Sequence, residues 1–151
     1  MSFVRSLILV AAVTGSAAPL AAQSADKPAG PATLTAADSA RYLEIGKSAT
    51  RWMLAGHADS LATALDPEAL EKAGGVNGLK AMHDQMQERI GPQTRLVQQK
   101  LTRRNGMVQF WHEAEFTNFT DEAVVIRWVM NEKMKIIGVG MNPLSKAPPV
   151  D

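Results

Sequence analysis

Two histidines stand among apolar residues in patterns that would place them inside a folded domain. His112 alternates with Val108, Phe110 and Ala114, so in a β-strand it would project from the buried face. His83 falls on the apolar stripe of a predicted helix. A histidine beside a substrate can transfer a proton near neutral pH, so His112, together with His83, is the candidate for acid–base catalysis. The alternative, which we prefer, makes each a histidine at the edge of the core that hydrogen-bonds to the backbone.

The histidines also raise the question of a metal site. His57, His83 and His112 do not show the i, i+4 or His-x-His spacing that is typical of metal ligands. We therefore predict no metal and no other cofactor. His57 and Asp59 flank the turn after the first predicted helix, and we expect Asp59 to cap the next helix. The carboxylates that would complete a metal site are Asp59, Asp84, Glu113 and Glu115.

The sequence predicts amphipathic helices in the N-terminal part of the domain, and one of them carries His83. Thr35 and Asp38 resemble a capping box at a helix start. The apolar stripe from Tyr42 to Met53 then predicts a long helix, and we expect Gly56 to end it. The helices that we expect cover residues 36–55, 58–65, a segment that starts at 66–67, and the stripe 79–90.

The last third of the chain predicts an antiparallel sheet. Asn105-Gly106 is a strong signal for a tight hairpin, because both central residues of that turn need positive φ. Residues 123–130 are apolar at nearly every position, which is typical of a central strand. Asn142-Pro143 should end the sheet, since proline cannot continue a hydrogen-bond ladder. The four predicted strands cover residues 95–102, 107–117, 123–130 and 134–141, with turns at 118–122 and 131–133. The predicted fold class is α+β.

This order of elements resembles the nuclear-transport-factor-2-like superfamily of cystatin-like α+β cones, and within it the small secreted bacterial domains of unknown function. The resemblance covers residues 36–143, and its most specific parts are the segment from Gly56 to Leu61 and the final Lys135-Ile-Ile-Gly-Val-Gly-Met-Asn-Pro143. It implies N-terminal helices packed on a curved four-stranded sheet, with a mouth that can hold a small molecule. Some members, such as ketosteroid isomerases and dehydratases, perform acid–base chemistry, whereas others only bind ligands or dimerise through the sheet. No residue pattern here transfers catalytic positions from an enzymatic member.

In such a cone, large side chains from the helices and the sheet would line the cavity. We predict a secreted, non-enzymatic domain that binds a small apolar ligand in the cone, or a protein partner through the cone or the sheet face. The alternative is an acid–base enzyme of the isomerase or dehydratase kind that uses His112. An enzyme cavity normally needs several convergent polar groups, and strand alternation supplies only one. The candidate cavity residues are Tyr42, Trp52, Met53, His83, Met86, Phe110, His112 and Trp128.

The opposite face of the strand that carries His112 offers a different surface. Trp111 alternates there with Glu113 and Glu115. An exposed tryptophan among carboxylates predicts either a partly covered surface or a contact in a homodimer.

The first 22 residues are typical of a secretory signal peptide. Arg5 supplies the positive start, Leu7 to Val13 forms a short apolar run, and small residues lead to Ala22. That run is far shorter than a bilayer span, so we expect cleavage and a periplasmic or secreted protein with no membrane partner. The predicted organisation is a signal peptide at 1–22, a flexible leader at 23–35, a domain at 36–144 and a flexible tail at 145–151.

Charge and cysteine content narrow the classes of partner. The chain has 16 Lys and Arg against 15 Asp and Glu, and one of the cations is Arg5 in the predicted signal peptide. The mature chain is then neutral, without the basic excess of a nucleic-acid-binding protein. It contains no cysteine, which excludes disulfides and a lipid anchor on cysteine. The predicted domain must therefore be stabilised by its core alone.

Overall fold

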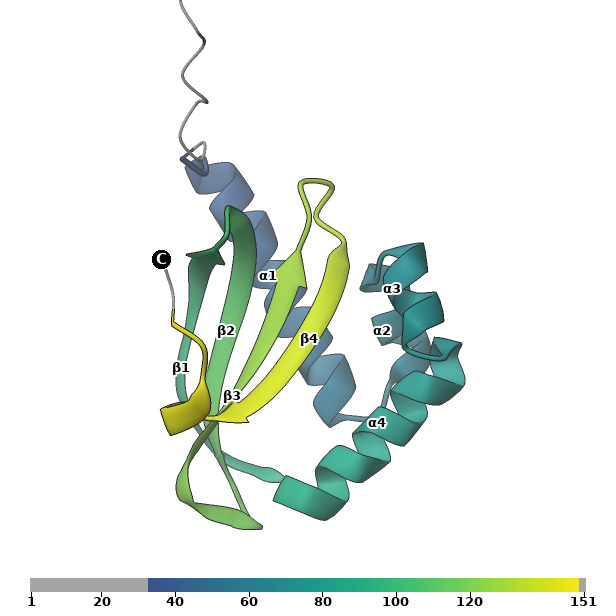
Figure 1. Cartoon of the computed structure of the whole chain (residues 1–151), viewed down its shortest axis with the longest axis vertical. Helices are drawn as coiled ribbons and strands as arrows, with labels where there is room; N and C mark the ends of the chain where they lie inside the picture. Colours follow the sequence, from purple (N-terminus) through teal and green to yellow (C-terminus); the bar gives the residue numbers. More distant parts are fainter. Residues whose placement is uncertain (1–32, 150–151) are drawn as a thin grey trace, which may run out of the picture. The chain divides into compact units, whose positions relative to one another are not determined.

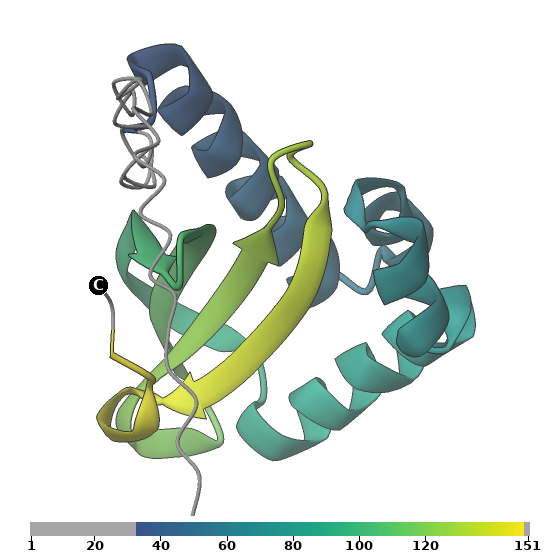
Figure 2. The same ribbon diagram turned by 45° about the horizontal axis from the view of Figure 1, so that its top comes forward.

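The computed structural model describes residues 33–149 (Figure 1). The predicted signal peptide, and the predicted leader up to residue 32, lie outside the described residues. Four α-helices precede a four-stranded antiparallel sheet, which confirms the predicted α+β class and the order of its elements. Figure 2 shows the same arrangement after rotation, with α1 along one face of the curved sheet and α4 beside its end.

The first helix, α1 (Ala36–Leu54), begins at the predicted cap. Thr35 Oγ1 accepts a hydrogen bond from the Asp38 backbone N–H at 3.0 Å, and its hydroxyl donates to the Asp38 carboxylate. The buried face of α1 includes Gly46 and Thr50 as well as the predicted apolar stripe. A methyl group added at Gly46 would overlap the ring of Phe110 in the sheet. Glycine at this position therefore lets the helix approach the sheet closely.

Three further helices follow, namely α2 (Ala58–Ala64), α3 (Pro67–Lys72) and α4 (Gly75–Ile90). Asp66 caps α3 by accepting from the Glu68 backbone N–H, and Pro67 occupies the first turn as predicted. The prediction that Asp59 caps α2 is wrong. His57 is the capping residue and makes no side-chain cap, while Asp59 lies inside the first turn, where its charge favours the helix N-terminus.

The sheet runs in the order β1-β2-β3-β4, so each strand pairs with its neighbours in sequence. The β1–β2 hairpin turns at Asn105 and Gly106, with φ of 52° and 77°, as the Asn-Gly signal predicted. β3 lies between β2 and β4, which confirms its prediction as a central strand. The strands are β1 (Gln93–Arg104), β2 (Met107–Phe116), β3 (Phe119–Met130) and β4 (Ile136–Pro143).

Several predicted strand boundaries are wrong. β1 extends from 93 to 104 in place of 95–102, and β2 ends at 116 in place of 117. The turn expected at 118–122 is only two residues long, and β3 already begins at Phe119, which pairs with Phe116. β4 begins at Ile136 and not at Met134, because Met134 has a φ of 59° within the preceding turn. The strand then continues through Pro143, which pairs with Val124. A proline is tolerated there because β4 is an edge strand.

Buried hydrogen bonds attach α1 to the sheet. Trp128 Nε1 donates to Thr50 Oγ1 at 2.8 Å, and the Thr50 hydroxyl donates to the Gly46 carbonyl at 2.9 Å. Near the start of α1, the Tyr42 hydroxyl donates to the Asn131 carbonyl at 3.0 Å. These bonds satisfy polar groups that would otherwise be costly to bury, and they fix the helix along the inner face.

After β4 the chain forms a 3-10 turn, η1 (Leu144–Lys146). Glu122 of β3 accepts hydrogen bonds from the Ser145 backbone N–H at 2.6 Å and from its hydroxyl at 2.8 Å. These bonds lower the pKa of the Glu122 carboxyl. The predicted domain boundary at residue 144 therefore falls inside this turn.

Candidate functional site

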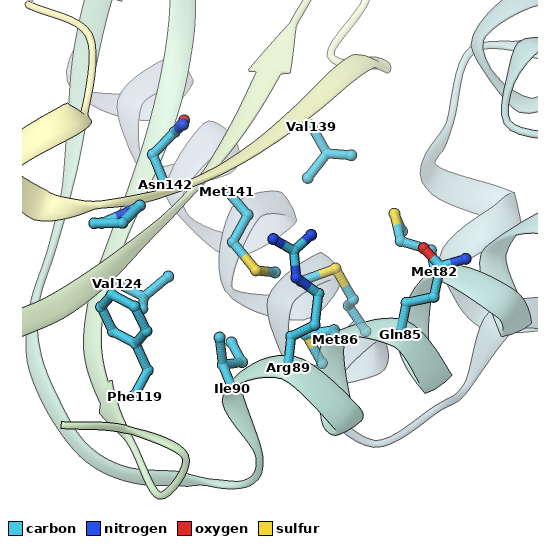
Figure 3. Close-up of a pocket in the computed structure, with 12 residues that line it drawn as sticks. Met82, Gln85, Met86, Arg89, Ile90, Phe119, Val124, Val139, Met141 and Asn142 are labelled. Carbon is cyan, nitrogen blue, oxygen red and sulfur yellow. The ribbon is translucent and has the colours of Figure 1, made fainter.

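A cavity of about 480 Å³ opens between α4 and strands β3 and β4 (Figure 3). Twelve residues of the described part of the chain line it; nine of them are apolar, and four of these are methionines. The three polar residues are Gln85, Arg89 and Asn142. The apolar lining consists of Met53, Met82, Met86, Ile90, Phe119, Val124, Val139, Met141 and Pro143.

Helical and strand periodicity together explain why these residues meet. Met82, Met86 and Ile90 recur every four residues and so share one face of α4. Met141 of β4 pairs with Ile126 of β3, on the sheet face that packs against the helices. Met53 reaches the same space from the last turn of α1. Methionine side chains are flexible and polarizable, so this lining can adapt to ligands of different shape.

The structure places only part of the predicted cavity residues around this cavity. Met53 and Met86 line it. Tyr42 lines a separate cavity of about 360 Å³ beside the Asn105-Gly106 hairpin. Phe110 and Trp128 are buried in the core, and Trp52 packs against that core from α1.

Both ring nitrogens of His112 hydrogen-bond to the side chains of two glutamines of β1. Gln99 Nε2 lies 2.9 Å from His112 Nδ1, and His112 Nε2 lies 2.8 Å from Gln93 Oε1. An amide nitrogen can only donate and an amide oxygen can only accept, so the pair of bonds requires a neutral imidazole protonated at Nε2. Burial lowers the pKa of His112 to about 4, which also keeps the ring neutral. His112 does not line the cavity described above.

His83 has a different partner from His112. Its Nδ1 donates to the Met53 carbonyl at 2.7 Å, so the ring satisfies a backbone group near the end of α1. The other side of the ring lies against Gly56. The structure therefore gives the two histidines separate environments, and neither histidine lines the cavity.

The residues considered for a metal site are not brought together. Within residues 33–149, no group of three or more His, Asp or Glu side chains is arranged to hold a metal ion. His57 and Asp59 are exposed at the start of α2, whereas His112 is buried in the sheet.

The outer sheet face carries Trp111 and Glu113, and both are buried despite facing away from α1. The Nζ of Lys100 lies 5.0 Å from the centre of the Trp111 ring, which is a cation–π arrangement. Glu113 accepts hydrogen bonds from Gln98 at 2.7 Å and from the Trp111 indole at 3.3 Å. The tryptophan that we expected to be exposed is therefore largely covered by polar side chains of its own sheet.

Arg127 completes the polar layer on this outer face. Its guanidinium donates to Gln109 at 3.1 Å and lies close to Gly140 of β4. Burial lowers the pKa of Arg127, and the neighbouring Arg104 lowers it further. The nearby Thr102 hydroxyl is buried without a hydrogen-bond partner in the described part of the chain.

Sequence reasoning missed the polar rim of the cavity. Gln85 and Arg89 are one helical turn apart and extend the predicted 79–90 stripe on its polar side. Their spacing could have identified them. Residues that flank the apolar stripe of a helix lie at the edge of the core or cavity that the stripe faces. Phe119 and Asn142 were missed because their predicted positions were in a turn and at the end of the sheet.

Comparisons with protein families, with curated protein sequences and with solved structures find no match to this chain. Within residues 33–149, every helix is too short or too polar to cross a bilayer. What is established for this chain is its fold class, an α+β fold in which helices pack on a four-stranded antiparallel sheet.

Proposed function

We propose that this protein binds a small apolar molecule in the cavity between α4 and strands β3 and β4. The observation that carries the proposal is the lining, which is apolar in nine of twelve residues around a volume of about 480 Å³. Ligand pockets typically enclose a few hundred to a thousand cubic ångströms, with mostly apolar walls and a few polar groups. The four methionines give this pocket walls that can adjust to the ligand.

Binding without chemistry is favoured over acid–base catalysis by the surroundings of the titratable groups. Both nitrogens of His112 are engaged by glutamines. Among residues 33–149, none of those that line the cavity is a histidine, aspartate or glutamate. A general acid or base must come within hydrogen-bond reach of the proton that it transfers, and His112 does not line this space.

We also propose the nuclear-transport-factor-2-like superfamily as the finer description of the fold. The order of elements, the curved meander and the long helix along its inner face support it. A cavity that opens between a helix and the concave side of the sheet fits the ligand-binding mode of such domains. A partner on the outer sheet face is less well supported, because Trp111 is already covered by neighbouring side chains.

A bulky substitution in the cavity should separate binding from stability. Val139 lines the cavity and is 41% exposed, so tryptophan at this position would occupy ligand space without disrupting the core. We expect Val139→Trp to weaken the binding of decanol, used as a neutral apolar probe, by about tenfold or more. Isothermal titration calorimetry measures the affinity, and thermal unfolding checks the fold.

A matched variant controls for the new tryptophan. Leu96 on β1 is 46% exposed and lines neither cavity described above. Leu96→Trp should leave decanol affinity unchanged. Equal affinities of the Val139 and Leu96 variants would count against this cavity as the binding site.

Export is the second part of the proposed function. We propose that the protein is cleaved after Ala22 and acts in the periplasm or outside the cell, on the basis of the apolar run from Leu7 to Val13 and the small residues after it. Mass spectrometry of the protein from its native cells should find a mature chain that starts near Gln23, in the soluble fraction outside the cytoplasm. An intact Met1 terminus in the membrane fraction would contradict export by cleavage.

A further inference from the structure

We propose that the ligand carries a carboxylate on an apolar body, and that Arg89 binds this carboxylate at the edge of the cavity. The inference rests on the proposed function, because it assumes that a small molecule occupies the space between α4 and the sheet. It adds the chemical class of that molecule, an apolar carboxylic acid.

Arg89 is positioned by the same helix face that supplies the apolar wall. It follows Met82 by seven residues, Gln85 by four and Met86 by three, so all four side chains lie along one side of α4. Figure 3 shows the Arg89 side chain extending from α4 toward Met141 of β4. The guanidinium therefore borders the apolar space and stays accessible at its rim.

The charge around the cavity is unbalanced. Among the described residues that line it, Arg89 is the only charged one. The ion pairs found within residues 33–149 join Lys47 to Glu44, Lys72 to Glu68 and Arg95 to Glu115, and none includes Arg89. A cation beside an apolar space, with no carboxylate of the protein bound to it, favours an anionic ligand group.

The neighbouring polar groups fit a carboxylate. A guanidinium can donate two parallel hydrogen bonds to the two oxygens of a carboxylate. The Gln85 amide lies one turn away from Arg89 on α4. Its N–H₂ group can donate a further bond to the same carboxylate. Nine apolar lining residues then require an apolar body on the same molecule.

Three probes with one apolar chain and different head groups test the inference on the purified protein. They are decanoate, which is anionic, decanol, which is neutral, and decyltrimethylammonium, which is cationic. Calorimetry at neutral pH and low salt should show decanoate binding about tenfold more tightly than decanol, and the ammonium compound most weakly. Tenfold is the lower end of what charge-assisted hydrogen bonds contribute, as expected for an exposed arginine.

A pair of variants assigns the preference to one residue. Arg89→Met keeps a long side chain and removes the charge, so decanoate should lose its advantage and bind about as well as decanol. Lys80→Met removes a cation from the same helix at an exposed position away from the cavity. It should keep the tenfold preference and thus controls for the change in net charge. Both residues are exposed, and thermal unfolding verifies that both variants fold.

The outcomes separate this inference from the proposed function. If decanol and decanoate bind equally to the unmodified protein, the carboxylate class is wrong, whereas the binding function stands. If the preference survives in Arg89→Met, the assignment to Arg89 is overturned. If none of the three probes binds, the proposed function fails together with the inference.

Discussion

A Gly46→Ala variant is expected to lower the free energy of unfolding by about 2 kcal/mol. In an ordinary helix interior the same change stabilises by about 1 kcal/mol, because alanine is the better helix former. The sign reverses here because the added methyl would overlap the ring of Phe110, which is fully buried and cannot move aside. The helix must shift away from the sheet, which also strains the Trp128–Thr50 hydrogen bond. Urea unfolding measures the loss.

Two comparisons make the Gly46 result specific. At Gly140 an added methyl would lie 2.8 Å from the Arg127 guanidinium, which is the far end of a flexible side chain, so Gly140→Ala should cost little. The double variant Gly46→Ala with Phe110→Leu should lose less stability than the sum of its single changes, because the two positions are in direct contact. A Gly46→Ala protein that is more stable than the original would contradict the close approach of α1 to β2.

The free energy of unfolding is also expected to depend on the protonation of His112. This residue alone should lower it by up to roughly 3 kcal/mol as the pH falls from about 6.5 to about 4. The pKa of His112 is about 4 in the folded state and about 6.5 in the unfolded chain. The unfolded chain therefore binds a proton first as the solution is acidified, and this proton favours unfolding. The contribution of His112 is fully present above pH 6.5, decreases below it, and is exhausted near pH 4.

The His112→Phe variant isolates this contribution from that of the carboxylates. At neutral pH it should be less stable by roughly 1–3 kcal/mol, because Gln93 and Gln99 lose their partner. Between pH 6.5 and 4 its stability should fall less steeply than that of the original protein. His57→Phe, which removes an imidazole from the exposed start of α2, is the matched control. Parallel pH profiles for the original and the His112→Phe protein would show that the buried imidazole does not resist protonation.

The parts of the fold that sequence predicted well depend on local chemistry. Thr35 caps α1 and Asn105-Gly106 forms a hairpin through interactions within a few residues. The incorrectly predicted start of β3 depends on distant partners. The Thr117 and Asn118 backbone N–H groups donate to carbonyls of Pro92 and Ile90, at the end of α4. This anchoring shortens the turn in a way that the residues of the turn do not indicate.

The candidate site was predictable only in its apolar part. Met53 and Met86 lie on stripes whose helical spacing points inward, and both line the cavity. Phe110 and Trp128 were also expected to line the cavity, but both belong to the packed core. They lie on strands, and the sequence of a strand indicates which face a residue is on but not how far it lies from a cavity. Arg89 was overlooked because a charged residue beside an apolar stripe usually faces solvent. Only the position of β4 against α4 shows that this edge borders a cavity.

The direct succession of strands in the sheet bears on how the chain folds. Each hairpin joins neighbours in sequence, so the sheet can grow by closing short loops, which carry a small entropic cost. The bonds from Trp128 to Thr50 and from Tyr42 to Asn131 instead join residues 78 and 89 positions apart. The hairpins form between neighbouring segments in the last third of the chain. α1 comes first in the sequence and can pack only after its partner strands have formed. The docking of the first helix is therefore the step with the highest cost in loop closure, and the part of the inner face that α1 covers stays exposed until it occurs.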